Sequence, residues 1–172
     1  CNSIAIPYSS CSSASTSYEW CQVSMNSYPG HTANSEIVVD VIVGGKAACI
    51  LMDSGRLLCW GEEHGAGNTQ SYLHNNLQQT AYNTNDPVVR VVMSSFSNCY
   101  ITQYGHLHCW AGGSSLSPNT NKYSTLNVTL PTGRTAVDVA GNDQNMCVLF
   151  DNGSISCIGG NLYGQLGDGS SQ

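Results

Sequence analysis

Charged residues are scarce in this sequence of 172 amino acids, and basic residues are the scarcest. Asp, Glu, Lys and Arg together make up 9% of the chain, with 5 Lys and Arg against 11 Asp and Glu and a formal net charge of -6. A protein that binds phosphate backbones needs a basic patch or stripe. The sequence contains none, so we do not expect nucleic acid to be a partner.

Long apolar runs and catalytic signatures are also missing. A membrane-spanning helix needs roughly 18 or more consecutive apolar residues, and no run in this sequence approaches that length. There is no nucleophile-elbow serine, phosphate-binding loop, dinucleotide fingerprint or pair of helical carboxylates. We therefore expect no membrane span, no cofactor and no enzymatic activity. No basic-then-apolar leader precedes Cys1, and we expect a mature, processed chain.

Cysteine, by contrast, is abundant, with 9 residues. Many cysteines in a small or repetitive chain are typical of an oxidising compartment, where disulfides form and persist. We therefore expect an extracellular or cell-surface location. Asn127-Val-Thr and Asn152-Gly-Ser match the acceptor pattern for N-linked glycans, so Asn127 and Asn152 are glycosylation candidates.

The chain is organised as an internal repeat. Three cysteine pairs follow one another at intervals of 50 and 48 residues, and a glycine lies between the two cysteines of each pair. Self-similarity at a fixed period is the signature of a repeat architecture. We expect three repeats, at about 36–86, 87–134 and 135–172, behind a Ser-rich, Cys-containing segment over residues 1–35.

Turn chemistry predicts how the repeat cysteines pair. Asp-Ser-Gly and Asp-Asn-Gly suit a type I turn followed by a left-handed glycine, a common three-residue hairpin loop. Such a loop pairs Met52 with Arg56 and, counting outward, places Cys49 opposite Cys59 at a Cβ separation of about 4.5 to 5.5 Å. A two-residue turn would instead make the cysteines diagonal neighbours. The predicted disulfides are Cys49–Cys59, Cys99–Cys109 and Cys147–Cys157.

Three cysteines lie outside the repeats. Cys11 and Cys21 have the same ten-residue spacing as the repeat pairs, so we expect a fourth disulfide between them. Cys1 is then the odd thiol, a candidate for a bond to another chain. Zinc is disfavoured because no Cys-x-x-Cys spacing occurs. His106 and His108 could together bind a metal, but no third ligand has a telling spacing, and we interpret them as two exposed imidazoles on a strand.

An alternating strand precedes each cysteine hairpin, in the segments EIVVDVIVGG, PVVRVVMSS and TAVDVAGND. A strand period of two places alternate side chains on opposite faces. The charged residues Asp40, Arg90 and Asp138 are predicted to face solvent. The predicted core consists of Val39, Val41, Leu57, Val89, Val91, Leu107, Val137, Val139 and Ile155.

The loop GNLYGQLGDG at residues 160–169, which follows a strand and a cysteine hairpin, resembles the repeat of the regulator of chromosome condensation family, and the resemblance extends over residues 36–172. The matching motif residues are Trp60, Gly61, Trp110, Asn161, Gly164, Gln165, Leu166 and Gly167. That family builds seven-bladed β-propellers from four-stranded sheets. The resemblance therefore implies an all-β fold of three propeller-like blades.

Three blades are too few for a closed propeller, which has four to eight. Because repeat units bury their apolar faces against their neighbours, we expect exposed faces at both ends of the array. Either the sequence is a fragment of a longer repeat protein, or copies of the chain complete one another. We favour a non-enzymatic extracellular structural protein that self-assembles head to tail as a filament or closed oligomer. Residues 1–35 are expected to dock on the last blade of a neighbour. The alternative is a recognition module that binds a protein partner through its loops.

Overall fold

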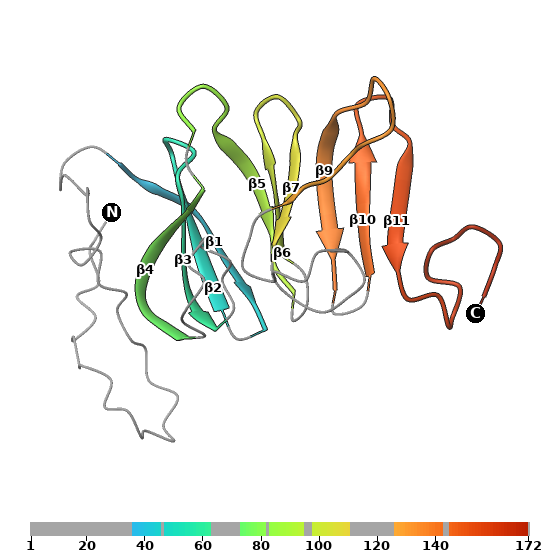
Figure 1. Cartoon of the computed structure of the whole chain (residues 1–172), viewed down its shortest axis with the longest axis horizontal. Coiled ribbons are helices and arrows are strands. Elements are labelled where there is room, and N and C mark those ends of the chain that lie inside the picture. The colour runs from blue at the N-terminus through green and yellow to red at the C-terminus, as the bar shows by residue number, and fades with distance from the viewer. Residues whose placement is uncertain are drawn as a thin grey trace, which may run out of the picture.

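A computed structural model describes residues 36–45, 47–62, 73–81, 83–94, 98–110, 126–142 and 145–171. These residues form strands and turns, with no helix among them, and the strands build three antiparallel sheets that stand side by side (Figure 1). The predicted all-β fold of three propeller-like blades is confirmed, and each sheet is one blade. The predicted irregular segment over residues 1–35 lies outside the described residues.

Strands that follow one another in sequence are neighbours in each sheet. Blade 1 has the order β1 (Val38–Gly44), β2 (Ala47–Met52), β3 (Leu57–Glu62), β4 (Leu73–Ala81). Blade 2 has the order β5 (Val88–Val92), β6 (Asn98–Thr102), β7 (Leu107–Trp110), β8 (Leu126–Asn127). Blade 3 pairs β9 (Ala136–Gly141), β10 (Asn145–Phe150) and β11 (Ile155–Gly159), so within the described chain β11 is an edge strand.

The central hairpin of each blade has the predicted three-residue loop. The Met52 amide donates to the Arg56 carbonyl at 2.9 Å, and Gly55 has the left-handed φ of 76° that the loop requires. Counting outward, Cys49 is paired with Cys59. The other two hairpins repeat this register, which pairs Cys99 with Cys109 and Cys147 with Cys157.

The first strand of each blade contains a β-bulge, and simple alternation did not predict it. In β5 the pairing with β6 shifts register between Val88 and Arg90, so Val89 is an extra residue. A bulge turns the side chains that follow it to the opposite face. Val88 and Val91, three residues apart, are therefore buried, whereas Val89 is exposed. The prediction that the bulge residues are buried was wrong for Val39, Val89 and Val137.

The other predicted core residues are buried between the blades and exposed at the two ends of the array. Leu57, Leu107, Val91 and Val139 are buried as predicted. Val41 and Ile155 are exposed, so the prediction was wrong for these two as well. Their exposure has a different cause from the bulge: Val41 lies on the first blade and Ile155 on the last, at the two ends of the array (Figure 1).

The charged residues of the first strands point away from the core, as predicted. Arg90 and Asp138 are both partly solvent-exposed, and Arg90 Nε lies 2.9 Å from Asp138 Oδ1. This ion pair joins β5 of blade 2 to β9 of blade 3. The equivalent residue in blade 1 is Asp40, which is exposed.

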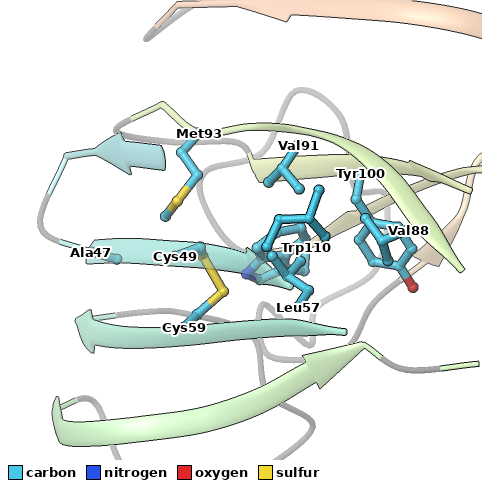
Figure 2. Packing of buried hydrophobic residues seen from close by; sticks show 10 residues of the cluster. Ala47, Cys49, Leu57, Cys59, Val88, Val91, Met93, Tyr100 and Trp110 are labelled. Atoms are coloured by element: carbon cyan, nitrogen blue, oxygen red, sulfur yellow. A yellow bond between two sulfur atoms is a disulfide. The ribbon is translucent and has the colours of Figure 1, made fainter. Parts of the chain in front are cut away.

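Two apolar clusters fill the spaces between the blades. Between blades 1 and 2, the Cys49–Cys59 disulfide and Leu57 face Tyr100 and Trp110 of the second blade (Figure 2). The full buried set of this cluster is Ala47, Cys49, Leu51, Leu57, Cys59, Val88, Val91, Met93, Tyr100 and Trp110. The second cluster consists of Cys99, Ile101, Leu107, Cys109, Ala136, Val139, Met146, Val148 and Phe150.

These clusters show that every blade has two different sides. The disulfide side carries the cysteine pair and its strand neighbours, such as Leu57 in blade 1. The valine side carries the buried residues of the first strand, such as Val88 and Val91 in blade 2. The disulfide side of blade 1 packs on the valine side of blade 2, and blades 2 and 3 pack in the same way. The array therefore has a direction.

Candidate interaction surfaces

The three disulfides predicted for the hairpins are present in the structure. Their Cα–Cα distances are 4.0 Å for Cys49–Cys59, 4.1 Å for Cys99–Cys109 and 4.1 Å for Cys147–Cys157. Directly opposed positions on antiparallel strands allow this bond with little backbone movement. The other predicted cysteine roles, a Cys11–Cys21 disulfide and a free Cys1, fall outside the described residues.

The valine side of blade 1 is exposed along β1. Each β1 residue on this side is more exposed than the equivalent residue of blade 2. Val38 is 39% exposed and Val88 3%, Val41 is 62% exposed and Val91 8%, and Val43 is 73% exposed and Met93 7%. The residue types are nearly the same, and both first strands carry the same bulge. Within the described chain, only blade 2 has a neighbouring blade on this side.

The disulfide side of blade 3 is exposed in the same way at the other end. Leu57, Leu107 and Ile155 occupy equivalent positions in the three hairpins, and their exposed fractions are 0%, 2% and 66%. Leu149 and the Cys147–Cys157 pair beside it are half-buried. Described residues on β1 at one end and on β11 at the other are thus exposed, although their equivalents are buried at the internal junctions.

Part of the valine side of blade 1 is nevertheless buried. Ile50, Met52 and Leu58 form a third cluster with the partly buried Trp60. Strand alternation places them opposite the Cys49–Cys59 disulfide, hence on the valine side. The exposed part of this side is therefore the β1 row, made of Val38, Val41 and Val43.

The loop after β11 contains most of the predicted motif residues. The Asn161 side chain accepts a hydrogen bond from the Leu166 amide at 3.0 Å and donates to Ser170 Oγ at 2.9 Å, so it ties the two ends of the loop together. The Gln165 side chain accepts from the Tyr163 amide at 2.8 Å. Gly164 and Gly167 have φ values of 74° and 68°, which favour glycine. The motif therefore shapes the loop.

This loop holds two large side chains in solvent. Leu162 and Tyr163 at its tip are both exposed, Tyr163 almost completely. The carboxylate of Asp168 accepts from the Ser170 hydroxyl and amide, and these hydrogen bonds lower its pKa. The remaining motif residues lie on strands: Trp60 is partly buried, Trp110 is buried, and Gly61 has a φ of 106° in β3.

The two predicted imidazoles differ from each other. His106 is exposed just before β7, and its Nδ1 lies 2.7 Å from Asp86 Oδ2. Burial alone would raise the pKa of Asp86, but hydrogen bonds from His106, the Tyr104 amide and the Thr102 hydroxyl outweigh it and hold that pKa below its ordinary value. His108 is half-buried rather than exposed and stacks on Tyr100 at a ring separation of 4.8 Å.

Burial controls the ionisation of this stacked pair. It lowers the pKa of His108, with a further decrease from the nearby His106, so the neutral imidazole is favoured. Burial also raises the pKa of Tyr100 to about 12, with a smaller contribution from Asp86. Within the described ranges, no group of three or more His, Cys, Asp or Glu residues is placed to hold a metal ion. Tyr100 belongs to the packing between blades 1 and 2, and His108 stacks on it.

Both glycosylation candidates are accessible. Asn127 is exposed at the end of β8, and Asn152 is exposed in the last hairpin turn, where its side-chain oxygen accepts from the Ser154 amide at 3.0 Å. Among the described residues there is no helix long and apolar enough to cross a membrane.

Sequence reasoning did not identify the residues that join the blades at the hairpin turns. The Val88 amide donates to the Gly55 carbonyl at 3.1 Å, and the Ala136 amide donates to the Gly105 carbonyl at 2.9 Å. The repeat spacing contained the signal, because the turn glycine always precedes the next first strand by a similar interval.

No protein-family model and no curated protein matches the sequence. Solved structures match the fold. The structure of human WBSCR16 aligns with a TM-score of 0.64 at 16% identity, over 73% of this chain and 33% of that chain. That of Prp20p from Saccharomyces cerevisiae aligns with a TM-score of 0.65 at 14% identity, over 77% and 34%. Yeast RCC1 (Prp20) bound to Kap60 gives 0.65 at 15% identity, over 78% and 34%.

These structures are β-propellers of the RCC1 type, and the likeness at such low identity is one of fold. The chain spans about a third of the length of each. The three sheets of this protein are therefore arranged as consecutive blades of a propeller.

Proposed function

We propose that this protein is a non-enzymatic extracellular structural protein that self-assembles head to tail. In each joint, the disulfide side of blade 3 of one copy packs on the valine side of blade 1 of the next. One observation carries the proposal: several residues that are buried at the internal blade junctions have exposed equivalents on β1 at one end and on β11 at the other. Ile155 on one end and Val41 on the other are the clearest examples.

The hydrophobic effect supplies the driving force. Full burial of a valine or isoleucine side chain contributes roughly 1.5 to 3 kcal/mol, and several such side chains gather on β1 and β11. A contiguous exposed apolar row is typical of a protein interaction site. A second copy fits best as the occupant, because the chain itself already pairs these two kinds of surface twice.

The three disulfides support an extracellular location. Such bonds persist in oxidising compartments and are rare in the cytosol. The accessible Asn127 and Asn152 are compatible with a glycoprotein, and the presence of glycans on them is part of the proposal. Mass spectrometry of the native material before and after deglycosylation tests it, because two unmodified asparagines would remove the glycoprotein assignment.

We extend the proposal to the segment over residues 1–35, which we assign as a docking segment that covers the last blade of a neighbouring copy. Within the described chain, β11 has an unpaired edge, and an exposed strand edge favours pairing with another chain. Cys1 would supply a covalent link if Cys11 and Cys21 pair with each other. Deletion of residues 1–21 should weaken assembly, and unchanged assembly would rule this segment out.

The test of self-assembly is the mass of the protein in solution with one matched pair of variants. Val41→Asp places a charge in the β1 row, whereas Val89→Asp places the same charge on an exposed bulge valine of blade 2, away from both ends. The wild type and Val89→Asp should form species well above 18.3 kDa. Val41→Asp should remain at the monomer mass. Monomeric wild-type protein at all concentrations would overturn the proposal.

The loop after β11 favours a second candidate, a recognition module that binds another protein. Leu162 and Tyr163 are exposed at its tip, and large exposed side chains of this kind are common energetic anchors at interfaces. The structural neighbours bind other proteins: Prp20p has binding properties to Gsp1p and histones, and yeast RCC1 is seen bound to Kap60. Under this alternative the wild type is a monomer, and Tyr163→Ser would weaken binding of the partner without changing the mass.

A further inference from the structure

Each internal blade junction is closed by a contact at the hairpin turn. The Gly55 carbonyl accepts a hydrogen bond from the first buried residue of the next blade, Val88, at 3.1 Å. The residue before it, Pro87, lies so close to the turn that a Cβ added to Gly55 would be 2.2 Å from the Pro87 Cβ. The turn thus needs glycine for its positive φ and also for the close approach of the next blade.

The second junction repeats this contact with different side chains. The Gly105 carbonyl accepts from the Ala136 amide at 2.9 Å, and a Cβ added to Gly105 would be 2.5 Å from the Thr135 Cβ. Proline in one case and threonine in the other occupy the space above the glycine. The contact therefore depends on the backbone and on the absence of a side chain at the turn.

The third turn has the same form, but its partner is missing from the described chain. Gly153 has a φ of 80°, and its amide donates to the Phe150 carbonyl at 2.9 Å, as the Gly55 amide does to Met52. Among the described residues, no atom lies within 4 Å of a Cβ added to Gly153, and none donates a hydrogen bond to its carbonyl. The turn is one half of the junction contact.

The other half is present at the start of β1. The Asp53 side chain accepts from the Ile37 amide at 3.1 Å, and the Asp53 amide donates to the Ile37 carbonyl at 2.8 Å. Asp151 holds Thr135 in the same way, at 3.2 and 3.0 Å. Because Thr135 is the residue seated on Gly105, Ile37 is held in the conformation that the internal junctions use. Its side chain is exposed.

We propose that the Gly153 turn is the seat for Ile37 and Val38 of the next copy. The Val38 amide donates to the Gly153 carbonyl across the joint, and the Ile37 side chain lies over the bare Gly153 α-carbon. This inference rests on the proposed self-assembly and adds to it the register of the joint. The partner is a second copy of this chain, and its β1 row meets blade 3 as β5 of blade 2 meets blade 1.

The seat also limits the size of a closed assembly. Its two halves lie on opposite ends of the molecule, so the contact is heterologous and either closes into a ring or continues as an open filament. Closed propellers have about four to eight blades, and the described part of each copy contributes three. The only multiple of three in that range is six. A ring closed from these described blades alone, within that range, is therefore a dimer.

Two glycine variants test the seat. Gly153→Ala adds a methyl group where the incoming Ile37 should lie. Gly133→Ala is the matched control, because Gly133 has a similar φ of 74° and no atom within 4 Å of an added Cβ, and it lies in the loop between β8 and β9. Both variants carry the same backbone strain, and their thermal unfolding should shift by similar amounts. Only Gly153→Ala should lose the high-mass species.

The possible results separate the seat from the proposed function. If Gly153→Ala assembles as well as Gly133→Ala and the wild type, the seat is wrong and self-assembly through the blade sides stands. If the wild type is monomeric, both fail. Hydrogen exchange gives a second readout: the Val38 amide should be protected in wild-type assemblies and lose that protection on dilution to monomer. A Val38 amide that exchanges equally fast in both states would overturn the seat.

Discussion

Blades 2 and 3 have the same hairpin and differ in what lies against it. Cys99–Cys109 and Cys147–Cys157 have equal loop lengths and equal Cα–Cα distances, yet Leu107 is buried and its equivalent Ile155 is exposed. The hairpin register depends on local turn chemistry, which both blades share. Burial depends on the neighbouring blade, which only blade 2 has on this side within the described chain.

The first strands of blades 1 and 2 show the same dependence on a neighbouring blade at the other end of the array. β1 and β5 carry equivalent bulges and nearly the same apolar residues, but only β5 is covered. An apolar side chain at one of these repeat positions therefore indicates a surface that is suited to packing against another blade. Whether it is covered depends on the assembly.

The largest expected effect on stability comes from truncating Leu107, which is buried, and comparing it with the equivalent but exposed Ile155. Leu107→Ala should reduce the free energy of unfolding by about 2 to 5 kcal/mol, because it leaves a cavity between blades 2 and 3. Ile155→Ala, compared in a Val41→Asp background that keeps the chain monomeric, should cost less than about 1 kcal/mol. Urea denaturation measures both. Equal losses would show that Ile155 is already covered in the monomer.

The next effect concerns the disulfides. Each closes a loop of the same length, so each should contribute a similar amount, about 2 to 4 kcal/mol and toward the low end. Access to a reductant differs, since Cys147–Cys157 is half-buried and Cys99–Cys109 is buried. Peptide mapping after mild reduction of the monomer should find Cys147 and Cys157 reduced first. Earlier reduction of Cys99 would contradict the exposure difference.

The stability of the junction between blades 1 and 2 should depend on pH through Tyr100. The pKa of Tyr100 is raised to about 12 from an ordinary value of 10, chiefly because the phenol is buried between blades 1 and 2. A raised folded-state pKa means that the stabilisation is complete below pH 10 and is lost as the pH rises toward 12. Ultraviolet titration should show one late-ionising phenol, and Tyr100→Phe should remove it. If the late ionisation is still seen in Tyr100→Phe, the phenol with the raised pKa belongs to another tyrosine and the prediction is wrong.

The smallest expected effect is electrostatic. A joint that copies the junction between blades 2 and 3 would place Asp138 of one copy where Arg90 lies, and Asp40 of the next copy where Asp138 lies, so two carboxylates would meet. Asp40→Arg should restore the pair and, at about 0.2 to 1 kcal/mol for an exposed ion pair, lower the dissociation concentration by up to about fivefold. Asp40→Ser, which only removes the charge, should give a smaller change. Weaker assembly of Asp40→Arg would contradict the copied geometry.

Much of the fold could be predicted from the sequence, because its determinants are local. The turn Asp53-Ser-Gly fixed the loop type, the loop fixed the register, and the register placed Cys49 opposite Cys59. The repeat spacing then extended the same result to the other blades. The type I turn and the left-handed glycine are properties of a few adjacent residues, which explains why the prediction succeeded.

The faces of the first strands could not be predicted from alternation, because a bulge is a property of two paired strands. One extra residue at Val89 moved the buried positions from a spacing of two to a spacing of three. The exposure of Val41 and Ile155 depends on which blade lies next to them. The junction contact at Gly55 required the coordinates, since it joins the backbone of one repeat to that of the next.

The most direct test of head-to-tail assembly is the mass of a mixture of two variants. Val41→Asp spoils the valine side of blade 1, and Ile155→Asp spoils the disulfide side of blade 3, so each variant keeps one usable end. Each alone should be an 18.3 kDa monomer, whereas an equimolar mixture should form a dimer of twice that mass and nothing larger. A mixture that stays at the monomer mass, or a single variant that still assembles, would contradict the account.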